Sequence, residues 1–140
     1  MDDNGPNPAR KHTNIKPIND FQDIELIRKT LSEKPRDLLL FDLLTQTGIR
    51  IKRLLVLRIN DIKNLSVGDE IPIKNKFGQF AVMTEQLLET VNRYLEHFRP
   101  EDNDWVFKSR KGSKPIDSRS CNRMVKGWLK LLDQNGLKGT

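Results

Sequence analysis

Apolar residues recur at helical spacing through the first half of the chain. Residues 1–18 contain three prolines and little apolar sequence, so we expect a flexible lead-in, with the folded part beginning near Asn19. Residues 36–47 have apolar side chains around most of their circumference, which predicts a helix buried at the centre of the domain and ended by Gly48. A third short helical segment is expected from Arg50 to about Leu57. The stripe that predicts the first helix consists of Phe21, Ile24, Ile27 and Leu31.

Between residues 58 and 83 the pattern changes to short alternating runs. Apolar pairs on each side of a turn at residues 75–78 predict a small antiparallel sheet. Thr84 is then expected to cap a helix that ends before Pro100. The side chains expected to face one another across the sheet are Ile71 and Ile73 on one strand and Phe80 and Val82 on the other.

The last part of the chain predicts a short extended segment at residues 105–109, a basic loop, and a helix from about Asp117 to Asn135. The apolar stripe of that helix consists of Cys121, Met124 or Val125, Trp128 and Leu132. These patterns together predict one α+β domain over residues 19–140, mainly α-helical, with helices around a small antiparallel sheet.

Composition narrows the class of protein. The apolar and charged fractions, 36% and 31%, are those of a folded globular protein rather than a disordered chain. We expect a cytoplasmic protein without membrane contact, because no apolar run approaches membrane-spanning length and the N-terminus lacks a signal peptide. A single cysteine and two histidines predict neither an internal disulfide nor a Cys/His metal site.

Positive charge is concentrated near the C-terminus. Residues 108–140 contain nine Lys and Arg but two Asp and Glu, which leaves residues 1–107 at about −1 of the total +6. This asymmetry is expected of a chain that binds a polyanion, although a solvated helix face would give the same pattern.

The sequence LLTQTGIRIKRLLVLRINDI contains an apolar helix, then Thr-Gly-Ile-Arg-Ile, then a Leu-rich turn leading to an Asp-containing segment expected to be a strand. It resembles the tyrosine recombinase, or phage integrase, family and its DNA breaking-rejoining catalytic fold. The resemblance implies that Arg50 contacts the scissile phosphate. A planar guanidinium suits this role because it can bind two phosphate oxygens and stabilise charge in the transition state. The motif alone is a weak signal and favours a surface arginine at a helix start, but the order of the surrounding segments shifts the balance towards the phosphate-binding role.

The hairpin sequence NKFGQF extends the resemblance. In the family a hairpin lysine donates a proton to the leaving 5′ hydroxyl, and the match places that role on Lys76. Strand alternation directs Lys74 to the opposite face, which makes it the weaker candidate. The alternative is a surface lysine that serves solubility.

The third block, residues 105–140, resembles the family's extended segment, basic loop and following helix. We expect its basic residues to contact DNA phosphates: Arg110, Lys111 and Lys114 in the loop, and Arg119 and Arg123 on the helix. The family's His-x-x-Arg motif and nucleophilic tyrosine would come after Thr140. Tyr94, the only tyrosine, is expected to be an aromatic residue at the edge of the core.

One position departs from the family pattern. Three residues after the motif arginine the family usually has an acidic residue, and here Arg53 stands there, preceded by Lys52. Either another carboxylate, such as Asp42 or Asp61, supports the site, or catalytic function is lost.

The resemblance therefore implies a DNA-binding fragment of a site-specific recombinase, whose complete form acts through a 3′-phosphotyrosine intermediate. Neither a metal nor a nucleotide cofactor is implied, and whether this chain is itself an enzyme stays open because it lacks the nucleophile. The expected partners are double-stranded DNA and further recombinase protomers. Two alternatives stay open: an inactive remnant that binds DNA or interferes with a full-length relative, and a helical protein-interaction module with a basic face.

Overall fold

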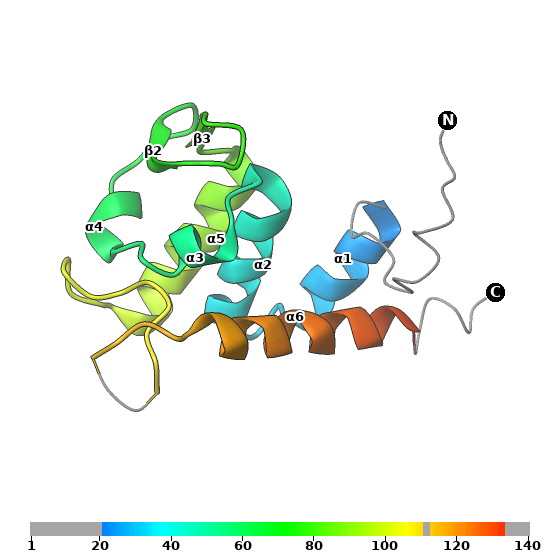
Figure 1. Cartoon of the computed structure of the whole chain (residues 1–140). Coiled ribbons are helices and arrows are strands. Elements are labelled where there is room, and N and C mark those ends of the chain that lie inside the picture. The colour runs from blue at the N-terminus through cyan, green and yellow to red at the C-terminus, as the bar shows by residue number, and fades with distance from the viewer. Residues whose placement is uncertain (1–20, 111–112, 134–140) are drawn as a thin grey trace.

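The computed structural model describes residues 21–110 and 113–133 (Figure 1). The expected lead-in, Lys111 and the predicted end of the last helix lie outside these residues. Within them, helices surround a small two-stranded sheet, which confirms the predicted fold class. The elements are α1 (Phe21–Thr30), α2 (Pro35–Thr47), α3 (Ile51–Leu54), α4 (Ile59–Ile62), β2 (Glu70–Lys74), β3 (Phe80–Val82), α5 (Glu85–Phe98) and α6 (Ser118–Leu132).

Helix α2 lies at the centre of the domain, as its apolar pattern predicts. Pro35 occupies its first turn, where a missing N–H is harmless, and Gly48 ends it in the left-handed conformation with φ of 71°. It packs along α5. Phe41 also meets Trp128 of α6 edge to face, with the ring centroids 5.5 Å apart.

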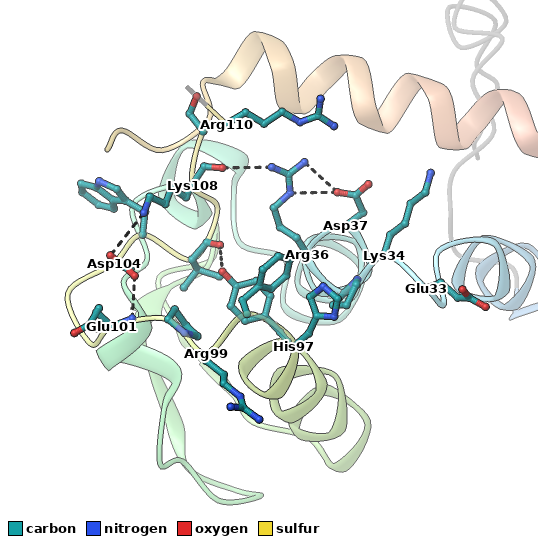
Figure 2. Close-up of a pocket in the computed structure, with 17 residues that line it drawn as sticks. Glu33, Lys34, Arg36, Asp37, His97, Arg99, Glu101, Asp104, Lys108 and Arg110 are labelled. Atoms are coloured by element: carbon teal, nitrogen blue, oxygen red, sulfur yellow. Dashed lines mark hydrogen bonds and ion pairs between the residues drawn. The ribbon is translucent and has the colours of Figure 1, made fainter. Parts of the chain in front are cut away.

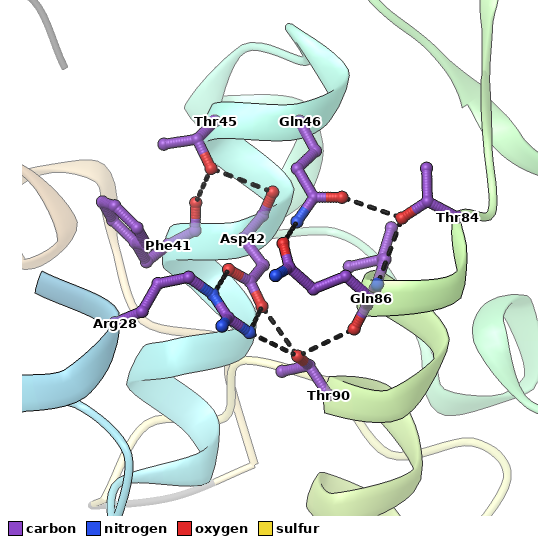
Figure 3. A network of polar contacts seen from close by, with 9 residues as sticks. Arg28, Phe41, Asp42, Thr45, Gln46, Thr84, Gln86 and Thr90 are labelled. Carbon is purple, nitrogen blue, oxygen red and sulfur yellow. Dashed lines mark hydrogen bonds and ion pairs between the residues drawn. The ribbon is translucent and has the colours of Figure 1, made fainter. Parts of the chain in front are cut away.

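A buried ion pair connects α1 to this core (Figure 3). Arg28 of α1 donates from Nε and Nη2 to the two carboxylate oxygens of Asp42, at 2.9 and 3.0 Å. Thr90 of α5 donates to the same carboxylate at 2.7 Å. The pKa of Arg28 is raised, first by its hydrogen bond to Asp42. One carboxylate therefore fixes three helices relative to one another.

The sheet corrects the predicted facing of its side chains. Lys74 pairs with Phe80, and Glu70 with Val82, so Phe80 and Val82 lie on the exposed face rather than against the apolar residues of β2. The register shifts between these pairs, where Pro72 cannot donate to the ladder. The core side is formed instead by Ile71, Ala81 and Met83, with Ile73 partly buried.

Two further segments differ from the prediction. Residues 59–62 form the short helix α4 rather than a strand, because the Asp61 carboxylate accepts the Arg58 backbone N–H at 2.9 Å and so starts a helical turn. The expected extended segment at 105–109 is a turn held by two isolated bridges, Arg58 to Trp105 and Lys108 to Pro115.

Helix α6 follows its sequence pattern. The Asp117 side chain accepts the Ser120 backbone N–H at 2.8 Å, and the stripe of Cys121, Trp128 and Leu132 is buried. Met124 and Val125 are both partly buried against the core. Among the described helices, none has the length and apolar character needed to cross a membrane.

Candidate nucleic-acid interface

Arg50 lies at the start of α3, where the chain turns sharply out of α2. The left-handed Gly48 makes the turn, and the Ile49 backbone N–H donates to the Thr47 hydroxyl at 3.2 Å. Arg50 is the N-cap residue of α3, and its side chain is exposed. Thr47 in turn donates to the Leu43 carbonyl at 2.6 Å, so the turn that presents Arg50 is held to the end of α2.

Lys76 lies in the loop between the two strands, next to the Arg50 turn. Its backbone N–H donates to the Gly48 carbonyl at 3.3 Å, and its side chain is exposed. The two candidate catalytic residues therefore come from adjoining loops. Lys74 lies on the outer face of β2, opposite Phe80.

The basic loop lies at the other end of α2. The Ser109 backbone N–H donates to the Lys114 carbonyl at 2.8 Å, and Arg36 donates to the Lys108 carbonyl at 3.3 Å. Arg36 and Gly48 are twelve residues apart on α2, which corresponds to about 18 Å along the helix axis. The expected DNA contacts thus form two separate groups, since Arg110 and Lys114 are exposed at this second end.

Arg119 and Arg123 are exposed on the first turns of α6, as expected for phosphate contacts. Arg123 is within 3.4 Å of the Ser120 hydroxyl. Hydrogen bonds from Ser120, helped by the two arginines, lower the pKa of the Asp117 carboxyl. This carboxylate caps the helix and partly offsets the positive charge around it.

Tyr94 is buried and unsuited to nucleophilic attack. Its hydroxyl donates to the Val106 carbonyl at 2.5 Å, and burial raises its pKa to about 12. The side chain is a core aromatic that joins α5 to the segment after it.

Both carboxylates that could replace the acidic residue missing at Arg53 have other partners in the structure. Asp42 is held in the core by Arg28 and Thr90, and Asp61 caps the first turn of α4. Both carboxylates are thus already hydrogen-bonded to other groups, and support of Arg50 by Asp42 or Asp61 stays a prediction. Arg53 itself is exposed.

Sequence reasoning also missed a cavity of about 690 Å³ (Figure 2). It lies between the N-terminal part of α2, the end of α5 and residues 99–110. Arg36, Tyr94 and Arg110 are among its lining residues. The walls come from two stretches far apart in the sequence, residues 33–37 and 94–110, so no local pattern could have predicted the cavity.

This helical domain presents an arginine and a lysine from adjoining loops, an arrangement suited to binding phosphate groups. The model of the phage integrase family matches residues 12–138, so the chain belongs to the phage integrase family, as its sequence resemblance predicts.

Three known proteins are similar to this chain. Tyrosine recombinase XerC of Staphylococcus epidermidis is 29% identical over 98 residues, which cover 68% of this chain and 33% of that protein. The probable integrase/recombinase YoeC of Bacillus subtilis is 25% identical over 113 residues, which cover 80% and 61%. A crystal structure of XerA recombinase has the same fold, with a TM-score of 0.64 and 20% identity over 89% of this chain and 44% of the other. The chain thus spans about a third of the length of XerC. These similarities favour a fragment of a site-specific recombinase over the alternative of a helical protein-interaction module with a basic face.

Proposed function

We propose that this chain binds double-stranded DNA and forms the Arg50 and Lys76 part of a site-specific recombinase active site. The observation that carries the proposal is the hydrogen bond from the Lys76 backbone N–H to the Gly48 carbonyl. It joins the hairpin to the turn that presents Arg50, so both side chains can reach the same stretch of DNA backbone.

The two side chains suit different parts of one reaction. The Arg50 guanidinium can donate to two oxygens of the scissile phosphate and stabilise the charge that develops there. The Lys76 ammonium, on a flexible stem from a loop, can deliver a proton to the leaving 5′ oxygen. In the complete reaction a tyrosine would attack the phosphorus and form a 3′-phosphotyrosine link.

Strand cleavage is not proposed for this polypeptide by itself. Its only tyrosine is Tyr94, whose hydroxyl is buried and hydrogen-bonded to a carbonyl. Exposed Lys52 and Arg53 surround Arg50 with positive charge, which favours phosphate binding even where catalysis fails. We propose that a nucleophile is supplied by a longer form of the protein or by another recombinase protomer. We further propose that the chain acts in the cytoplasm, because the similar recombinases XerC and YoeC come from bacteria, which keep their DNA there.

Titration of a labelled 30-base-pair duplex at several salt concentrations tests the proposal. The log of the binding constant should fall linearly with the log of salt concentration, by about 0.9 for each phosphate contacted. The double variant Arg50→Ala and Lys76→Ala removes two phosphate contacts. It should therefore make the slope shallower by about 1.8 and weaken binding at low salt.

The matched control is the double variant Lys29→Ala and Lys63→Ala. Lys29 lies on α1, and Lys63 is already paired with Asp102 at 2.6 Å, so removing the same two charges should leave the slope nearly unchanged. A wild-type slope near zero, or equal slopes for the two double variants, would refute the proposed role of Arg50 and Lys76.

A further inference from the structure

Two phenylalanines of the β2–β3 hairpin lie in solvent. Phe77, in the loop, is 72% exposed, and Phe80, on the outer face of β3, is 43% exposed. Loops usually carry polar residues, and a buried phenylalanine contributes about 2 kcal/mol relative to an exposed one. Phe77 therefore contributes little hydrophobic stabilisation to this fold, and Phe80 only part of what a buried phenylalanine would. A function outside the fold would explain them.

Hydrogen bonds within the loop hold the backbone at Phe77 in one conformation. The Asn75 side-chain oxygen accepts the backbone N–H groups of Phe77 and Gln79, at 2.9 and 3.0 Å. Gly78 is left-handed, with φ of 80°, and its N–H donates to the Asn75 carbonyl. The loop is also joined to the domain by the Lys76 bond to Gly48. Little backbone freedom is therefore left to lose when Phe77 meets a partner.

Each exposed ring has an ammonium group beside it. The Lys76 Nζ is 5.2 Å from the centroid of the Phe77 ring, and the Lys74 Nζ is 5.4 Å from that of Phe80. Aromatic rings interleaved with basic groups bind nucleic acids, because the rings stack on bases while the cations contact phosphates.

The charge around the hairpin favours DNA over an apolar protein surface as the partner. Arg50, Lys52 and Arg53 are all exposed on the neighbouring segment. The carboxylate of β2, Glu70, lies at the far end of the strand from the loop. A polyanion that offers flat apolar surfaces between its charges matches this arrangement.

We propose that Phe77 packs against a DNA base while Lys76 contacts the adjacent backbone. The proposal rests on the DNA-binding function proposed above. It adds a base contact that positions the DNA relative to Arg50 and Lys76. Insertion of an apolar side chain at a base step would also bend or open the duplex locally.

The test compares Phe77→Ala with Phe21→Ala in the duplex titration. Phe21 is 74% exposed at the start of α1, away from the hairpin in Figure 1, and is therefore a matched control. Phe77→Ala should weaken binding by about fivefold, the low end of the range for a stacking aromatic, because opening a base step in a duplex offsets part of the stacking energy. Its salt slope should equal that of the wild type, because no charge is lost, whereas Lys76→Ala should lower the slope by about one contact.

Tryptophan substitution gives a second measurement. The emission of a Phe77→Trp protein should be quenched by DNA relative to the wild type, which contains Trp105 and Trp128, and that of a Phe21→Trp protein should not. If the wild type binds DNA but Phe77→Ala binds as tightly as Phe21→Ala, or Phe77→Trp is not quenched, the base contact is wrong while DNA binding stands. A wild type without salt-dependent binding would instead contradict the proposed function itself.

Discussion

At the scale of single residues, the Arg28–Asp42 ion pair is a two-bond contact at the edge of the described core. The Asp42 carboxylate is fully buried and accepts from both Arg28 and Thr90. Removing one member of such a pair leaves the other charge poorly solvated. We therefore predict that Asp42→Ala lowers the free energy of unfolding by about 3 kcal/mol, measured by urea denaturation.

The control for this variant is Asp37→Ala on the same helix. Asp37 pairs with Arg36 at 3.3 Å, and both side chains are partly exposed. Pairs of this kind contribute up to about 1 kcal/mol, so Asp37→Ala should change stability much less. Similar losses for the two variants would show that Asp42 has no special role in joining α1 to the core.

At the scale of the elements, the turn between α2 and α3 determines where Arg50 lies relative to Lys76. Gly48 has φ of 71°, and a Cβ there would come within 3.9 Å of the Asn75 Cβ. There is room for a methyl group, but the left-handed conformation is unfavourable for alanine. We predict that Gly48→Ala lowers stability by about 1 kcal/mol and weakens DNA binding, measured by thermal melting and duplex titration.

Gly127 is the matched control for this substitution. It is exposed within α6, and a Cβ there meets nothing within 4 Å. Gly127→Ala should therefore raise stability by about 0.5–1 kcal/mol through helix propensity and leave DNA binding unchanged. Our account of the turn is contradicted if Gly48→Ala is as stable and as tightly bound as Gly127→Ala.

The elements also show the limit of pattern reasoning. The helices α2, α5 and α6 follow from their apolar periodicity and caps, because each buries one face or its whole circumference. The register of β2 with β3 does not follow, because Pro72 and the shift beside it change which side chains face the core. Helix α4 is four residues long, too short for any period to appear.

At the scale of the whole molecule, α2 separates two basic groups. Arg50 and Lys76 lie at its C-terminal end, and the loop with Arg110 and Lys114 lies at its N-terminal end (Figure 1). A duplex that contacts both groups must extend along at least the length of α2, about 18 Å, which is roughly five base pairs of B-DNA.

This separation predicts additive effects on DNA binding. The double variant Arg110→Ala and Lys114→Ala should make the salt slope shallower by the amount expected for two lost phosphate contacts. Combining it with Arg50→Ala and Lys76→Ala should give the amount expected for four. Titrations of the three variants on one 30-base-pair duplex measure this. If the combined variant binds no more weakly than the more impaired of the two double variants, only one group contacts DNA.

By itself, the sequence determined the helices other than α4, the mainly helical fold class, the family and the candidates Arg50 and Lys76, because periodicity, caps and a local motif depend on neighbours along the chain. Only the tertiary structure decided which groups meet. It joined the Lys76 loop to Gly48, buried Tyr94 against Val106 and committed Asp42 to Arg28 and Thr90. It also left Phe77 in solvent. These outcomes depend on contacts between distant segments, whose geometry is set by packing of the whole core rather than by any local pattern.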